Sequence, residues 1–151
     1  MGLLTKPTQS PRVWFEIPGL DTFQVLVEYQ TPEDMKRINQ ACQKNVLDKA
    51  TRQIVTETDN DAFARLMTRS IVKDWRGLTL SVLKKLMPVS DETAKAIEES
   101  NGELPFDEKD LHFLAEQTYA PTFIAPIMDI AMDMLAFRKA EEAAVVKNSV
   151  G

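Results

Sequence analysis

The stretch "VKDWRGL", Val72 to Leu78, separates two apolar segments near the middle of the chain. We interpret it as the end of an amphipathic helix that begins at Asp59 or Asn60. Trp75 would be the last residue of the buried stripe, Arg76 would place a cation at the negative end of the helix dipole, and Gly77 would supply the left-handed cap. This pattern predicts a helix through Trp75, followed by a third helix near residues 79–87 that stops at Pro88.

Upstream of this helix, two β-rich runs flank the turn sequence "PGLD". They are "RVWFEI", residues 12–17, and "TFQVLVEY", residues 22–29. In the second run Phe23, Val25 and Val27 share one face, so that face should pack against other parts of the chain. The pattern predicts a β-hairpin.

Thr31 and Pro32 mark the start of the first helix, as its N-cap and first helical residue. Apolar residues then recur at helical spacing from Met35 through Cys42 to Val46, which predicts a helix to Val46 and makes Cys42 a small core residue. The following "ATRQIVTETD", residues 50–59, favours a short strand because Ile54 and Val55 are β-branched.

Downstream, the sequence predicts mainly helices. A short helix begins at Asp91, Asn101 and Gly102 form a turn, and Asp107 caps a helix with inward leucines. A last helix runs from residue 121 or 122 to about 146, with Pro126 in its first turn. The predicted fold class is α+β, with an N-terminal β-hairpin or small antiparallel sheet followed by a mainly helical C-terminal part. We expect a flexible arm at residues 1–11, a single domain at 12–146 and a flexible terminus at 147–151.

Composition places the chain among ordinary globular proteins. It has 151 residues, 44% hydrophobic and 27% charged, with a net charge of −5. The acidic balance argues against nucleic-acid binding, and the most apolar stretch is too short to span a bilayer. The single cysteine excludes an internal disulfide framework. No signal peptide opens the chain, so we expect a cytoplasmic protein.

Charge is unevenly distributed along the chain. Residues 65–85 hold six basic residues and one acid, whereas residues 91–133 hold eleven acids and two lysines. These blocks either attract each other within one molecule or order head-to-tail contacts between copies, so a homo-oligomer is one expectation. Arg65, Arg69 and Lys73 step by four along one face of the predicted helix. They are either a solvated face or a partner-binding row.

The residues give little support for catalysis. His112 is the only histidine and has no serine or cysteine nucleophile nearby in sequence. Asp129 and Asp133 lie one helical turn apart without a histidine, and the chain contains no glycine-rich phosphate loop. We therefore expect no catalytic, cofactor-binding or metal-binding residues, no cofactor, and no enzymatic activity.

Three segments together resemble the tail assembly chaperones of long-tailed bacteriophages and prophages. They are the Trp-x-Gly of "VKDWRGL", the "GELPFDEKDLHFLAEQ" of residues 102–117, and the "FIAPIMDIAMDMLAFRKAEEAA" of residues 123–144. The resemblance covers residues 61–146 and marks as motif positions Trp75, Gly77, Leu104, Pro105 and Phe106. The chain departs from the family pattern between Trp75 and Leu104, where an additional apolar helix lengthens the linker.

The resemblance implies a non-enzymatic protein of the host bacterial cytoplasm, absent from the mature virion. It would bind the tape measure protein, keep it soluble, and help recruit tail tube subunits. Met128, Met132 and Leu135 are candidate contacts with these partners, because flexible thioethers suit adaptable surfaces; the alternative is core packing. A structural tail or connector subunit retained in the virion is the rival function. The resemblance also implies a longer frameshifted product, for which Lys147 and Asn148 are a candidate slippery site.

Overall fold

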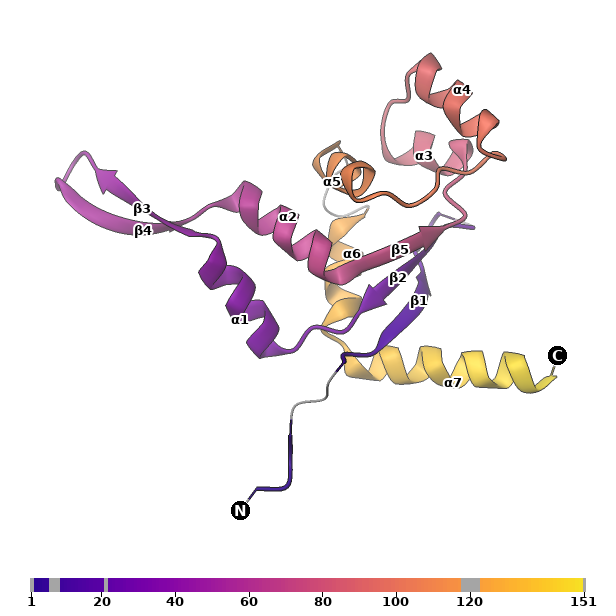
Figure 1. Cartoon of the computed structure of the whole chain (residues 1–151), viewed down its shortest axis with the longest axis horizontal. Coiled ribbons are helices and arrows are strands. Elements are labelled where there is room, and N and C mark those ends of the chain that lie inside the picture. Colours follow the sequence, from indigo (N-terminus) through magenta and orange to yellow (C-terminus); the bar gives the residue numbers. More distant parts are fainter. Residues whose placement is uncertain (1, 6–8, 21, 118–122, 151) are drawn as a thin grey trace.

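The computed structural model describes residues 2–5, 9–20, 22–117 and 123–150. A three-stranded antiparallel sheet is at the centre, in the order β1-β2-β5. A two-stranded sheet of β3 and β4 projects from helices α1 and α2, away from the centre (Figure 1). The predicted α+β class is confirmed, with small antiparallel sheets ahead of a mainly helical part.

The predicted N-terminal hairpin is confirmed. β1 (Arg12–Glu16) pairs antiparallel with β2 (Gln24–Glu28) and places Phe15 opposite Val25. The inner face carries Val25 and Val27, which are fully buried. The outer face carries Trp14 and Leu26 among polar side chains. On this face Arg12 Nε lies 2.9 Å from Glu28 Oε1 in an ion pair.

The prediction for "VKDWRGL" is wrong, because most of this stretch is a strand. Gly77 has the predicted positive φ, but it follows β5 instead of capping a helix, and Arg76 is not at a helix end. α2 (Asn60–Ile71) ends four residues earlier than Trp75, and Val72 is extended with φ −91° and ψ 116°. β5 (Val72–Arg76) then pairs with β2 and sets Trp75 opposite Val25. Pairing with a buried strand outweighs the helical periodicity, which continued through Trp75.

The first helix also ends earlier than predicted. α1 (Pro32–Ala41) begins at a capping box in which Thr31 and Asp34 each accept a hydrogen bond from the other's backbone N–H. Cys42 is buried at its end, and Val46 lies in β3 (Gln43–Asp48) rather than in the helix. The predicted strand at residues 50–59 is confirmed as β4 (Gln53–Thr58), which pairs with β3.

The helices between β5 and the C-terminal segment begin close to the predicted positions. α3 (Leu80–Leu86) is capped by Thr79, and α4 (Asp91–Glu99) by Ser90. Asn101 and Gly102 form the predicted turn with positive φ. α5 (Glu108–Gln117) follows Asp107, whose Oδ1 accepts hydrogen bonds from the backbone of the first helical turn.

The single C-terminal helix of the sequence prediction is two helices. α6 (Ile124–Ala131) and α7 (Met134–Val150) are separated at Met132 and Asp133, and the predicted starts at 121 or 122 lie outside the described residues. The Asp133 carboxylate accepts hydrogen bonds from the N–H groups of Leu135 and Ala136, so it caps α7. The break therefore occurs at an N-cap aspartate, and Pro126 lies in the first turn of α6 as predicted.

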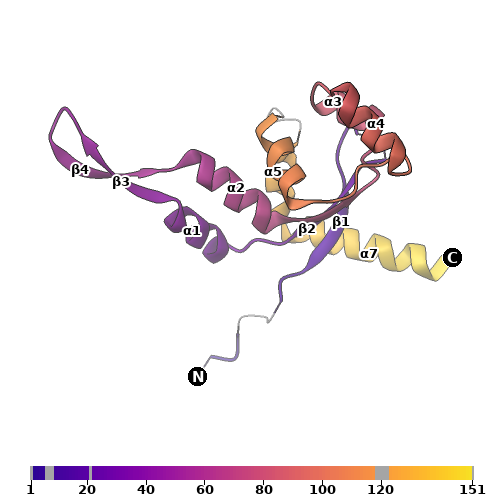
Figure 2. The ribbon, with the colours of Figure 1, turned by 45° about the horizontal axis from the view of Figure 1, so that its top comes forward.

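The break turns α7 toward β1, as two views show (Figures 1 and 2). Phe137 of α7 is fully buried, and its ring centroid is 5.1 Å from that of Phe15 and 5.6 Å from that of Tyr29. Gln30, which is buried, ties three elements together. Its N–H donates to the Ala131 carbonyl of α6, and its side chain donates to the Ser70 carbonyl of α2.

Candidate functional site

The motif residues Trp75, Leu104 and Phe106 meet at the end of β5. Trp75 Nε1 donates to the Leu104 carbonyl at 2.8 Å, and the Trp75 and Phe106 rings pack edge to face at 4.9 Å. Only 3% of Trp75 is exposed. Because the indole is buried and its N–H is satisfied, the arrangement holds the segment after α4 onto the central sheet.

Gly77 completes this junction. Its φ is +73°, and a Cβ built there would lie 2.0 Å from the Thr22 carbonyl oxygen. Thr22 Oγ1 in turn donates to the Gly77 carbonyl at 3.1 Å. Pro105, between Leu104 and Phe106, is exposed. Four of the five motif residues therefore take part in one structural contact between β5, the β1–β2 connection and the segment before α5.

The candidate partner residues of the C-terminal segment divide into two groups. Met128 is half-buried and packs against the core. Met132 and Leu135 are exposed, at 48% and 67%, and Met134 between them is 37% exposed. We call Met132, Met134 and Leu135 the α6–α7 ridge. It presents two flexible thioethers and a leucine at the turn between the helices, where an apolar partner surface can reach them.

Arg65 and Arg69 lie beside α5, as part of a second surface. Together with α5 they line a hollow whose two adjoining parts have volumes of about 280 and 520 Å³. We call it the α2–α5 groove, and it is lined mainly by Arg65, Arg69, Glu108, His112, Phe113 and Glu116. Arg69 Nε is 3.9 Å from Glu108 Oε1, with both side chains well exposed, so the pair is weak and open to exchange.

Phe113 is the groove residue that sequence reasoning missed, and it is 53% exposed. Leu111 and Leu114 are buried on the opposite side of α5. The signal was present, because an aromatic residue between two inward leucines at i and i+3 must face away from them. Its outward position gives the groove an apolar contact among charged side chains.

Lys73 does not share a face with the two arginines, which corrects the predicted row. It belongs to β5, and its Nζ turns back to the Arg69 carbonyl at 3.2 Å. The same Nζ lies 3.9 Å from Glu28 Oε2 on the outer face of the sheet. The row breaks because the helix ends at Ile71, so a spacing of four no longer brings residues onto one side.

One acidic group of α5, Asp110, has a raised pKa. Burial raises the pKa of Asp110 above its ordinary value of 3.8, and the neighbouring Asp107 carboxylate raises it further. Among the described residues, no three histidine, cysteine or acidic side chains come together in a cluster that could hold a metal ion. The described helices include none with the length and apolar composition needed to cross a membrane.

The projecting hairpin was not anticipated as a surface. Leu47 and Ile54 face each other across β3 and β4 and are 60% and 74% exposed. We call residues 43–58 the hairpin arm. Sequence reasoning placed Val46 in a helix, so the pairing of the two strands could not be recognised.

Comparison with known proteins identifies the chain at the level of family. Residues 28–148 match a family model described as YdaY prophage protein. No curated protein and no solved structure matches the chain. The matched range contains the hairpin arm, the α2–α5 groove and the α6–α7 ridge.

Proposed function

The chain belongs to the YdaY prophage protein family, and from this premise we propose that it is a non-enzymatic tail assembly chaperone. In this role it binds the tape measure protein, keeps it soluble in the host bacterial cytoplasm, and helps recruit tail tube subunits. It leaves the particle before the tail is complete. Membership in a prophage family and the resemblance of residues 61–146 to such chaperones support the proposal.

The observation that carries the proposal is the exposed α6–α7 ridge. A long, helical, apolar client offers side chains at i, i+3 and i+4, and a small ridge of exposed Met and Leu side chains can bind them. Methionine adapts to many partners because its side chain is unbranched and polarizable. A contact of this small size is also reversible, as a chaperone requires.

The α2–α5 groove is the second contact surface in this proposal. Arg65 and Arg69 face Glu108 and Glu116 across it, so a client that carries both charges can exchange ion pairs with it. Such pairs add specificity and association rate more than affinity. Phe113 adds one apolar contact at the same place.

The hairpin arm and the N-terminal residues favour a second function, that of a structural tail or connector subunit. Leu3 and Leu4 are 92% and 99% exposed, and the arm projects from the body (Figure 1). Projecting segments of this kind often become ordered in permanent assemblies. The two functions differ in one observable property, which is whether the chain remains in mature particles.

Co-expression with the cognate tape measure protein tests the proposal. The chain should raise the soluble fraction of the tape measure protein, and Leu135→Ser should remove most of that gain. Val145→Ser is the matched control, because Val145 lies on the same helix and is also 67% exposed. Equal effects of the two variants, or no gain with the unaltered chain, would contradict binding at the ridge. Stoichiometric amounts of the chain in purified particles would support the structural subunit instead.

A further inference from the structure

The hairpin arm has strand edges that the rest of the described chain does not cover. β3 and β4 form a two-stranded sheet of their own, which extends beyond α1 and α2 in both views (Figures 1 and 2). An isolated hairpin is marginally stable in water, and its outer edges present unpaired N–H and C=O groups. Such an edge is a template for another strand.

The register shows which backbone groups point outward. Asp59 N–H donates to the Cys42 carbonyl at 2.7 Å, in line with the ladder that pairs Gln43 with Thr58. Hydrogen-bonded and non-hydrogen-bonded pairs alternate in an antiparallel ladder. The alternation therefore points the backbone groups of Gln43, Asn45 and Leu47 away from β4. On the other edge, those of Ile54 and Thr56 point away from β3.

We propose that a second copy of this chain pairs with the outer edge of β3, antiparallel and across a two-fold axis at Val46. The product is a closed dimer with a four-stranded sheet in the order β4-β3-β3-β4. In this register Lys44 of each copy lies opposite Asp48 of the other, and the two Val46 side chains face each other. The inference concerns self-association and does not rest on the proposed chaperone function.

Charge selects both the edge and the register. Lys44 and Asp48 are the two charged residues of β3, and the proposed register pairs them twice. A shift of the two-fold axis to Asn45 or Leu47 sets one of these charges opposite Val46. β4 has Glu57 as its one charged residue, so pairing β4 with its own copy forms no ion pair. Like charges directly opposite each other are destabilising, whereas opposite charges stabilise a ladder.

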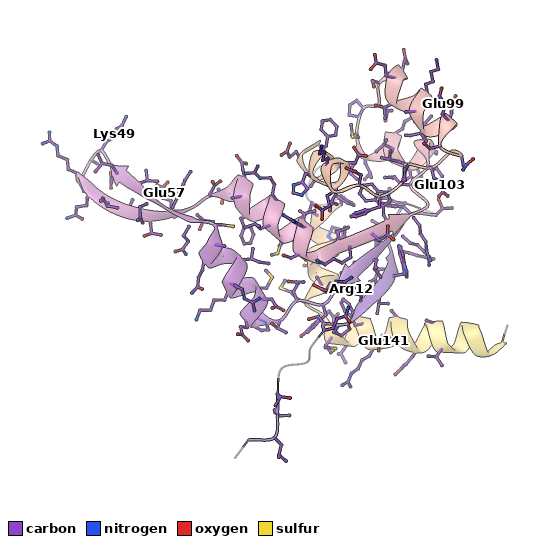
Figure 3. The ribbon with its side chains drawn as sticks, viewed as in Figure 1. Arg12, Lys49, Glu57, Glu99, Glu103 and Glu141 are labelled. Carbon is purple, nitrogen blue, oxygen red and sulfur yellow. The ribbon has the colours of Figure 1, made fainter. Side chains whose placement is uncertain are left out.

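The side-chain rows agree with this register. Val46 lies opposite Val55 within one arm, so the dimer aligns four valines across its four strands on one face. Lys44 lies opposite Glu57 within the arm, so the neighbouring row alternates Glu57, Lys44 and the second copy's Asp48. Figure 3 shows Glu57 on the arm and Lys49 at its tip.

The tip of the arm is complementary to the base of its partner. The same register brings Lys49 opposite the second copy's Gln43, two residues after α1 ends at Ala41. The last turn of α1 contains no basic residue of its own. A cation near the C-terminal end of a helix is favourable because the carbonyl ends carry partial negative charge.

Proline substitution tests which edge is used. Asn45→Pro removes an outward N–H from β3, and Thr56→Pro removes one from β4; neither should remove a bond between the two strands. Both variants also lose the same side-chain hydrogen bond, from Thr56 Oγ1 to Asn45 Oδ1 at 3.4 Å. Sedimentation equilibrium of the isolated chain should show a dimer for the unaltered protein and for Thr56→Pro, and a monomer for Asn45→Pro.

A mixing experiment tests the register. Lys44→Asp sets two aspartates opposite each other in a homodimer, and Asp48→Lys sets two lysines opposite each other, so each variant alone should be monomeric. An equal mixture should form a heterodimer in which both pairs are opposite in charge. Tryptophan fluorescence confirms that the central sheet of each variant is folded.

Three outcomes overturn the proposal: a monomeric unaltered chain at the highest concentration it tolerates, equal behaviour of the two proline variants, or no heterodimer on mixing. If the chain is a monomer and its arm binds a tail protein, the outer edge of β3 pairs with a strand of that protein and not with a second copy. None of these measurements involves the tape measure protein, so their failure leaves the chaperone function untouched.

Discussion

The central sheet and the hairpin arm are both antiparallel and both carry β-branched residues, yet their surroundings differ completely. Val25 and Val27 in the sheet are 0% exposed, whereas Leu47 and Ile54 in the arm are 60% and 74% exposed. The difference shows that alternation and pairing make a strand, while burial depends on which helices pack on it. α6 and α7 cover the inner face of the sheet, and no helix covers the arm in the described structure.

The two regions should therefore differ in what stabilises them. In the sheet, Phe23 stacks on Phe123 with ring centroids 6.1 Å apart and packs edge to face on Trp75. In the arm, stability comes from cross-strand pairs such as Asn45 with Thr56, each contributing about 0.2–1 kcal/mol. Substitutions in the sheet should lower the free energy of unfolding of the whole body, and substitutions in the arm should not.

The largest effect is expected for Trp75→Ala. Loss of the buried indole leaves a cavity and an unpaired Leu104 carbonyl, and should lower the free energy of unfolding by about 3–5 kcal/mol. Trp14 on the outer face, with the Arg76 guanidinium 4.2 Å from its ring, is the matched control. Trp14→Ala should cost about 1 kcal/mol. Urea unfolding followed by far-UV circular dichroism measures both free energies of unfolding. Equal costs would show that the inner and outer faces of the sheet contribute equally to stability.

Gly77→Ala should have the next largest effect. The added Cβ would meet the Thr22 carbonyl at 2.0 Å in a left-handed backbone, so strain and overpacking together should cost about 2–4 kcal/mol. Gly102→Ala isolates the backbone term, because Gly102 also has positive φ but no atom within 4 Å of an added Cβ. Its cost should be about 1 kcal/mol. Thermal unfolding of the two variants separates the cost of the positive φ from the cost of the contact with Thr22. Equal midpoints would show that an alanine Cβ at residue 77 does not clash with the Thr22 carbonyl.

A paired threonine substitution tests the comparison directly. Val25→Thr places a hydroxyl in the fully buried face of the sheet and should cost about 1–3 kcal/mol. Ile54→Thr, on the exposed face of the arm, should change the body's stability by less than about 0.5 kcal/mol. Chemical denaturation monitored by tryptophan fluorescence reports on the body in both cases. A large loss from Ile54→Thr would mean that the arm and the body unfold as one unit.

Local signals in the sequence predicted the starts of elements better than their ends. Thr31, Asp59, Thr79 and Asp107 were all recognised as caps or helix starts, because an N-cap acts through its own side chain within one turn. The ends of α1 and α2 were wrong because the apolar spacing continued past them. Trp75 takes extended backbone because β2, far earlier in the chain, pairs with its segment. Val46 takes it because β3 forms a hairpin with the next strand, β4. The apolar spacing of the sequence shows neither pairing.

The sequence pointed to several exposed residues of the candidate surfaces, but not to how these residues are grouped in space. Met132 and Leu135 proved exposed, and Arg65 and Arg69 share a groove, whereas Met128 is half-buried and Lys73 lies on another surface. Met132 and Leu135 are exposed while Met128 is half-buried because the helix breaks at Asp133. A continuous helix would have placed the three side chains along a single stripe. The outward position of Phe113 followed from its place between two inward leucines and was overlooked. The hairpin arm was missed because the sequence does not show the β3–β4 pairing.

The smallest effect is expected for Asp110→Asn. Asp110 lies in α5, outside the hairpin arm, so this substitution should leave the arm unchanged. The raised pKa of Asp110 means that the folded state holds the proton more tightly than the unfolded state does. The contribution of this group to stability is therefore fully present below the unfolded pKa of 3.8, and declines as the pH rises through the folded pKa. Asp110→Asn removes the titration. The melting temperature of the variant, relative to that of the unaltered protein, should rise from acid to neutral pH and then stay constant. Any fixed cost of the asparagine cancels in this difference. A difference that is independent of pH, or one that falls toward neutral pH, would contradict a carboxyl group whose partial desolvation and acidic neighbour Asp107 oppose its ionisation.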